Sequence, residues 1–220
     1  MKSIKTFGLL AFTIIVYLTS CGKSSKNDPI PQNKEKVLHQ YDFSTSNSAW
    51  GTGENSYSKR SLSNGYYKVY NKSDSDFYFS YTNVMFNGLS DKIAMEAKMN
   101  ISGGNSSWPA FGGLTWNYKI GGLQINVFGY YNNGTYEIFG YDDNNSFIEI
   151  QPITASAAIK KNADNVLRIE QRSDNKFHFL INGTEVYSTD INDYNLDVSG
   201  IYADPKTTTA VDYYKAIQLP

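Results

Sequence analysis

Residues 92–101 alternate between apolar and polar side chains, reading Lys92-Ile93-Ala94-Met95-Glu96-Ala97-Lys98-Met99-Asn100-Ile101. Every second position from Ile93 to Ile101 is apolar. Successive side chains of a β-strand point to opposite faces of the sheet, so a strict period of two predicts a strand with one buried face. The run therefore indicates a long strand rather than a helix.

The rest of the chain after residue 37 also shows apolar–polar alternation broken by turn residues, and no stretch has a sustained apolar period of 3.6. Asn64-Gly65 and Asn182-Gly183 are candidate hairpin turns, because Asn-Gly tolerates the positive φ of a two-residue turn. Only residues 154–160 could hold a short helical turn. We expect further strands at 56–62, 66–71, 77–81, 110–118, 123–130, 135–141, 166–171, 176–181, 184–187, 198–203 and 210–219. The sequence thus predicts an all-β, two-sheet antiparallel sandwich.

The N-terminus has the organisation of an export signal. A basic start with Lys2 and Lys5 precedes a charge-free apolar run over 7–18. A run of that length fits the hydrophobic region of a signal peptide, roughly 7–15 residues, and is short of the about 20 that span a bilayer. The join Leu18-Thr19-Ser20-Cys21 resembles the bacterial lipobox. We expect a lipoprotein signal peptide over 1–20 and lipidation of Cys21, the alternative being an ordinary secretory signal with a chance cysteine.

Residues 21–37 are small, polar and charged, with two prolines, and predict a flexible linker ahead of a domain over 38–220. Gly22 is not the aspartate that retains lipoproteins in the inner membrane of enterobacteria. We therefore expect a lipid anchor in the cell envelope, in the outer membrane, with the domain periplasmic or surface-exposed. The Lys-, Asn- and Tyr-rich composition resembles that of Bacteroidetes lipoproteins.

The charge balance argues against nucleic acid as a partner. Removal of the signal peptide leaves 18 basic and 21 acidic residues, a formal charge of −3. A nucleic-acid-binding domain would carry a clustered basic face. We expect contact with the membrane only through the lipid on Cys21.

Several short motifs, taken in order, resemble the concanavalin A-like lectin/glucanase (laminin G-like) domains of bacterial lipoproteins. The motifs are Tyr41-Asp42-Phe43 followed by Trp50, FGGLTW at 111–116, the hairpin over 165–186, GIYA at 200–203 and VDYY at 211–214. The resemblance covers residues 38–220 and implies a jelly-roll sandwich of two antiparallel sheets. This fold hosts lectins, glycosidases and adhesion modules, so it does not decide the function.

Catalytic signatures are weak. Members that hydrolyse β-glucans carry a Glu-x-Asp-x-(x)-Glu strand, and neither Glu137 with Asp142 nor Glu149 reproduces that spacing. His39 and His178, the only histidines, suggest no triad. The question of an enzyme stays open, with a non-catalytic domain favoured. The resemblance also allows a structural calcium ion at Asp42 and Asp212, although turn capping or pairing with nearby groups is the favoured role of both.

Aromatic and amide side chains crowd into the segment 108–141. Flat rings beside amide groups suit sugars, which present apolar C–H faces and many hydroxyls. We expect half of the rings to be core, with Leu114, Trp116 and Tyr118 sharing one face. The candidate ligand-binding residues are Trp108, Trp116, Asn117, Tyr118, Tyr130, Tyr131, Asn132 and Tyr136. The leading hypothesis is a non-catalytic carbohydrate-binding sandwich with a glycan or polysaccharide as partner. The alternatives are a glycoside hydrolase-like enzyme and a structural or protein-interaction module of the envelope.

Overall fold

The computed structural model of the protein describes residues 34–44, 49–83, 86, 89, 91–104, 108–122, 124–190 and 195–220. The signal peptide, Cys21 and most of the linker lie outside these residues, so those predictions stay predictions. The described residues form strands and turns without any helix, and none of them belongs to a helix long and apolar enough to cross a membrane.

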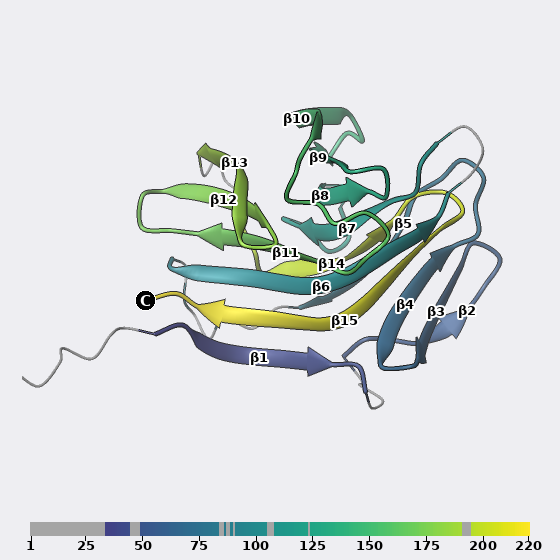
Figure 1. The fold of residues 1–220 in the computed structure, drawn as a ribbon, viewed down its shortest axis with the longest axis horizontal. Coiled ribbons are helices and arrows are strands. Elements are labelled where there is room, and N and C mark those ends of the chain that lie inside the picture. Colours follow the sequence, from purple (N-terminus) through teal and green to yellow (C-terminus); the bar gives the residue numbers. More distant parts are fainter. Residues whose placement is uncertain are drawn as a thin grey trace, which may run out of the picture. The chain divides into compact units, whose positions relative to one another are not determined.

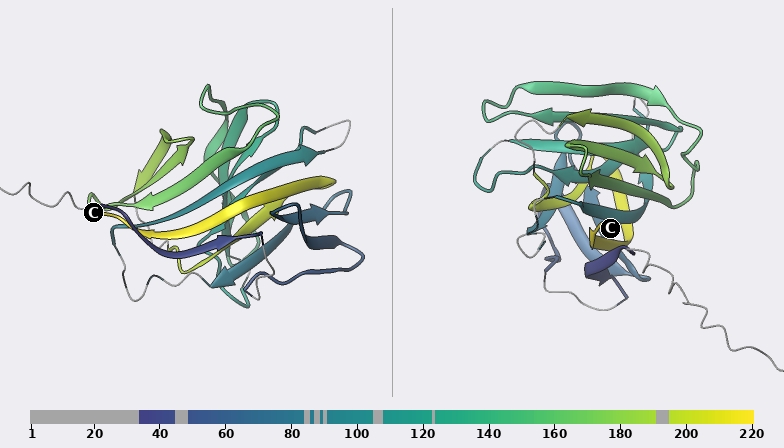
Figure 2. Two further views of the ribbon diagram at one scale, coloured as in Figure 1. Left: turned by 60° about the horizontal axis from the view of Figure 1, so that its bottom comes forward. Right: turned by 90° about the vertical axis from the view of Figure 1, so that its left-hand side faces the viewer.

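Two antiparallel sheets face each other (Figures 1 and 2). The larger sheet, sheet A, has the order β13 (Thr184–Asp190), β12 (Lys176–Ile181), β11 (Asn165–Gln171), β6 (Ile93–Gly103), β15 (Thr207–Gln218), β4 (Tyr66–Asn71), β3 (Ser58–Ser63), β2 (Gly53–Glu54), with β1 (Lys36–Asp42) also pairing with β15. The smaller sheet, sheet B, has the order β10 (Phe147–Ala155), β9 (Thr135–Tyr141), β8 (Ile125–Tyr131), β7 (Phe111–Trp116), β14 (Val198–Ala203), β5 (Tyr78–Asn83). The predicted two-sheet sandwich is confirmed.

Strand β6 lies at the centre of sheet A, between β11 and β15. Met95, Ala97 and Met99 are fully buried, as their alternation predicted. On the opposite face Glu96 and Lys98 take part in ion pairs with neighbouring strands. The strand therefore joins a dry core to a charged outer surface.

The core is aromatic and spans both sheets. Trp116 on β7 packs against Phe177 and Phe179 on β12, with ring centroids 5.1 and 5.4 Å apart. Trp50 is 1 % exposed and lies 5.3 Å from Tyr67, as expected for a tryptophan at the opening of the domain. Each ring of this size buries about 150–250 Å², so these contacts dominate the adhesion of the two layers.

The hairpin turns are correctly predicted. Asn64 and Gly65 have φ of 54° and 77°, and Asn182 and Gly183 have φ of 52° and 80°. These positive values are those of the two-residue turns that match the twist of the flanking strands.

The prediction missed three strands: β1, β2 and β10. The helical turn allowed at 154–160 is wrong, because β10 continues to Ala155 and Thr154 pairs with Tyr136 of β9. Pro152 lies within β10, which is tolerated because β10 is an edge strand with only β9 as a neighbour.

The start of β1 is fixed by a charged contact. The guanidinium of Arg168 on β11 donates to both carboxylate oxygens of Glu35, at 2.5 and 3.2 Å, and also to Glu96 at 3.1 Å. From Lys36 onward β1 pairs with the last residues of β15. The chain is thus held to sheet A from its first described residues.

Candidate functional site

Sheet B carries a second aromatic cluster on the face away from the core. Phe111, Val127, Phe139 and Tyr202 form a buried group that is separate from the main core. Phe77, Phe79, Tyr131 and Tyr141 pack against it as partly buried side chains. We call this set the outer aromatic layer.

Two glycines make this layer possible. Gly113 on β7 and Gly129 on β8 lie directly opposite each other in the sheet. A Cβ on Gly129 would approach Phe111 Cζ to 2.5 Å, which is too close for any side chain. With no side chain at either position, Tyr202 on β14 reaches to 5.8 Å from Phe139 on β9, although β7 and β8 run between them.

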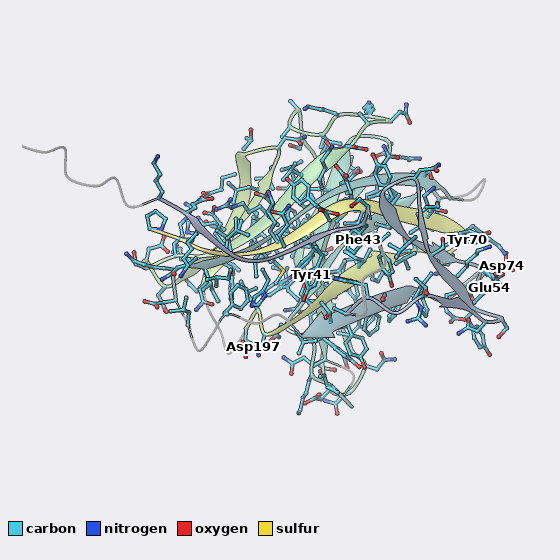
Figure 3. All side chains as sticks on the ribbon, turned by 90° about the horizontal axis from the view of Figure 1, so that it is seen from below. Tyr41, Phe43, Glu54, Tyr70, Asp74 and Asp197 are labelled. Atoms are coloured by element: carbon cyan, nitrogen blue, oxygen red, sulfur yellow. The ribbon has the colours of Figure 1, made fainter. Side chains whose placement is uncertain are left out.

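A cleft of about 340 Å³ opens at one end of the outer aromatic layer. Its walls come from the segment before β5, the segment between β6 and β7, the end of β9 and the turn between β14 and β15. The lining residues are Asp74, Ser75, Phe77, Trp108, Pro109, Tyr141, Tyr202, Asp204 and Pro205. Its volume falls in the range of small-molecule sites. Figure 3 places Asp74 at the end of the molecule away from the start of β1.

Trp108 forms the exposed wall of the cleft. Its side chain is 68 % exposed, the largest exposure of any large hydrophobic side chain in the described part of the chain. Among the other lining residues, the ring of Phe77 stacks on Tyr141 at 5.3 Å and 19° and on Tyr202 at 5.5 Å and 24°. The cleft is therefore bounded by flat aromatic surfaces.

Asp204 is the buried carboxyl group among the residues that line the cleft, whereas Asp74 is largely exposed. Its backbone N–H donates to the carbonyl of Phe111, which fixes the carboxyl beside the layer. The Tyr202 hydroxyl donates to its carboxylate at 2.9 Å. Burial raises the pKa of Asp204 to about 6, and the negative charge of Glu137 contributes in the same direction.

Glu137, on β9, belongs to the same face but is 9 % exposed. It accepts a hydrogen bond of 2.9 Å from the Tyr131 hydroxyl, and burial raises its pKa. It does not line the cleft. The outer face thus holds two carboxyl groups that cost free energy to ionise, of which only Asp204 reaches the cleft.

The predicted site residues fall into three groups. Trp108 lines the cleft, and Tyr131 belongs to the outer aromatic layer. Asn132 follows Tyr131, is partly buried, and donates its backbone N–H to the carbonyl of Ala110, two residues from Trp108. These three residues lie at the same end of the outer face.

Asn117 and Tyr118 lie at the other end of β7. Asn117 has a φ of 54°, and this left-handed residue ends the alternation of the strand. Tyr118 was expected on the face of Leu114 and Trp116, and that prediction is wrong. Its ring packs on the outer side instead, with its centroid 4.8 Å from that of Tyr81. Asn117 is 3 % exposed, and its side-chain oxygen accepts the backbone N–H of Asn195.

Three of the predicted residues are core residues. Trp116, Tyr130 and Tyr136 are 0, 2 and 3 % exposed. The two tyrosine hydroxyls donate to the backbone carbonyls of Met99 and Val186 on sheet A. Their rings offer no face to a ligand, so we correct the candidate site by removing them.

Sequence reasoning missed three cleft residues, namely Phe77, Tyr202 and Asp204. Gly200, Tyr202 and Asp204 are spaced by two, which places them on one face of β14 and its continuation. That spacing was the available signal, but only the strand order shows that this face meets Trp108.

The two aspartates named for calcium have the local roles that were favoured. Asp42 accepts hydrogen bonds from the backbone and hydroxyl of Ser44, and Asp212 pairs with Lys98 at 2.7 Å. No group of three His, Cys, Asp or Glu side chains among the described residues could hold a metal ion. The ammonium of Lys98 already pairs with the carboxylate of Asp212, which weighs against a calcium ion at this pair of aspartates.

No protein-family model and no curated protein matches the sequence. Solved structures share the fold. One is from work on endo-acting O-glycanases that prominent members of the human gut microbiota express to initiate mucin breakdown, with a TM-score of 0.59, 13 % identity, and coverage of 84 % of this chain and 100 % of that one. A Bacillus subtilis protein of unknown function with a galectin-like fold gives 0.58 and 11 %, covering 84 % and 97 %. The κ-carrageenase of Pseudoalteromonas carrageenovora, in complex with an oligotetrasaccharide, gives 0.55 and 10 %, covering 88 % and 99 %. At these identities the likeness concerns the fold alone, which agrees with the concanavalin A-like resemblance.

Proposed function

We propose that this protein is a lipid-anchored lipoprotein of the cell envelope whose cleft binds carbohydrate without cleaving it. The observation that carries the binding function is the cleft itself, which is lined by an exposed Trp108, stacked aromatic rings and the carboxylate of Asp204. An apolar sugar face can lie on such rings while its hydroxyls bond to the carboxylate and phenol groups. The neighbours named for O-glycan and carrageenan chemistry add support at the level of the fold.

Binding is tested with the purified protein on an array of mucin glycans and plant and algal polysaccharides. Trp108→Ala removes the exposed wall, and we expect it to abolish binding. Tyr57→Ala is the matched control, because Tyr57 is 65 % exposed and lies outside the cleft. Equal loss in both variants, or no binding by the unaltered protein, would refute the proposal.

The anchor requires a separate experiment. Cells expressing the protein are fed a labelled fatty acid and then fractionated. We expect label in the outer-membrane fraction and its loss in Cys21→Ser. A labelled Cys21→Ser protein would contradict lipidation at this residue.

Glycoside hydrolysis is the second candidate, favoured by the presence of Asp204 and Glu137 with raised pKa values on one face. Carboxyl groups with perturbed pKa values are the tools of glycosidases. We place it second because Glu137 is buried behind the Tyr131 hydroxyl and does not line the cleft. Release of reducing sugar that both Asp204→Asn and Glu137→Gln abolish would establish hydrolysis instead.

A flat, polar face without a cleft and with every tryptophan buried would favour the third alternative, a structural or protein-interaction module. The described residues instead contain a cleft with an exposed tryptophan, which counts against that alternative.

A further inference from the structure

The cleft combines two kinds of surface that both favour positive charge. Among the described residues, four of the nine that line it are aromatic, namely Phe77, Trp108, Tyr141 and Tyr202. The faces of such rings carry partial negative charge, and a cation within about 6 Å of a ring is attracted to it. The remaining lining includes two carboxylates, Asp74 and Asp204.

No Lys, Arg or His is among the residues that line the cleft in the described part of the chain. A basic group beside the lining is Lys206, whose ammonium pairs with Asp74 at 3.1 Å and also donates to the carbonyl of Lys72 at 2.7 Å. Lys206 therefore offsets the charge of Asp74, which is largely exposed. Among the residues that the structure describes, Asp204 has no basic partner of this kind, and its carboxylate accepts a hydrogen bond from the neutral Tyr202 hydroxyl.

Glu137 adds negative charge behind the layer, so the local field at Asp204 is unfavourable for a second anion. A ligand with a carboxylate or sulfate would meet repulsion in this cleft. A ligand with an ammonium group would meet aromatic faces and a carboxylate without a basic partner. The aromatic walls and the carboxylate of Asp204 thus both favour a cationic ligand over an anionic one, although they are separate features of the sequence.

We propose that the cleft recognises an amino sugar with a free ammonium group, placed beside Asp204 and against the aromatic wall. This inference rests on the proposed carbohydrate binding and specifies the class of sugar. The flat, exposed ring of Trp108 favours a pyranose over a lysine side chain, because a sugar can stack its C–H face there while its ammonium turns inward.

The test compares oligosaccharides of equal length at pH 6, where the amines of an amino sugar are largely protonated: oligoglucosamine with free amines, its N-acetylated form, and an oligouronate. Isothermal titration of the whole protein gives the three affinities. We expect the free amine to bind about tenfold more tightly than the N-acetylated form, in line with a cation–aromatic and charge-assisted contact. The oligouronate is expected to bind least.

Asp204→Asn is expected to bring the ratio of the amine and N-acetyl affinities close to one, whatever it does to each affinity. Asp197→Asn is the control, since Asp197 is exposed and precedes β14 at the end opposite Asp204. It should leave the tenfold ratio unchanged.

The outcomes separate the two proposals. Equal binding of the amine and N-acetyl forms, or tighter binding of the oligouronate, overturns the amino-sugar inference but keeps carbohydrate binding. Binding of an oligolysine peptide with no binding of any oligosaccharide overturns both proposals. The absence of binding to all of these probes also overturns both.

Discussion

Asp204→Asn is predicted to make the fold more stable at neutral pH while weakening the site. The pKa of Asp204 is raised from 3.8 to about 6 by burial, so the folded protein holds the ionised carboxylate at a cost. At about 1.4 kcal/mol for each pH unit between the two values, that cost reaches about 3 kcal/mol near pH 7. Asparagine carries no charge, and its amide oxygen can still accept the Tyr202 hydroxyl. The gain is therefore an upper limit of about 3 kcal/mol, which corresponds to a rise in Tm of roughly 6–12 °C for a domain of this size.

The sign of the pH dependence follows from the raised pKa. Below about pH 4 the carboxyl is protonated in both the folded and the unfolded chain, and the substitution should change little. As the pH rises through 6, the wild-type protein loses this stability and the variant does not. Urea unfolding of both proteins at pH 3.5, 5.5 and 7.5 measures the difference, with Asp197→Asn as the control at an exposed aspartate. A variant that is less stable at every pH, or a gain that does not depend on pH, would refute the assignment of Asp204 as a buried, costly acid.

Three further predictions concern the packing and the calcium question. Trp116→Ala should lower the free energy of unfolding by about 3–5 kcal/mol, because it leaves a cavity in the core, whereas Trp108→Ala should lower it by less than about 0.5 kcal/mol. Equal losses in thermal unfolding would contradict the exposed fractions of the two side chains, 0 and 68 %. Gly129→Ala should cost at least about 1–3 kcal/mol and weaken glycan binding, since its Cβ would enter the neighbouring aromatic ring, and an unchanged Tm would show that the layer can move aside. Calcium or EDTA should leave the Tm unchanged, because Asp212 is already paired with a lysine; a clear rise with calcium would mean that the ion displaces that lysine.

The fold was largely predictable from the sequence because alternation and turn chemistry are local. The period of two in β6 and the Asn-Gly turns need only a few neighbouring residues to be understood. Edge strand β10 was missed because its two faces are both partly exposed, so its apolar residues show no alternation. The strands that were predicted correctly are enough to predict the two-sheet sandwich.

The site was predictable only in part because it depends on strand order. Trp108 and Asp204 are far apart in the sequence and meet because β14 lies next to β7 in sheet B. Composition alone could not predict that Trp108 is exposed and Trp116 is buried, because this depends on which side of the sheet each side chain takes. At Tyr118, one left-handed residue before it reversed the expected face.

The attachment of β1 has a mechanical consequence. Strand β1 runs antiparallel to the end of β15, and Glu35 is clamped by Arg168 where the strand begins. Asp74, which lines the cleft, lies toward the other end of the long axis (Figure 3). If the protein is tethered through Cys21 and holds a polymer in the cleft, tension would run along β1 and load its hydrogen bonds in shear, all together rather than one after another. Strands paired and loaded in this way resist rupture far better than a strand that is peeled from its end. This arrangement suits a domain that must stay bound to a polymer under tension.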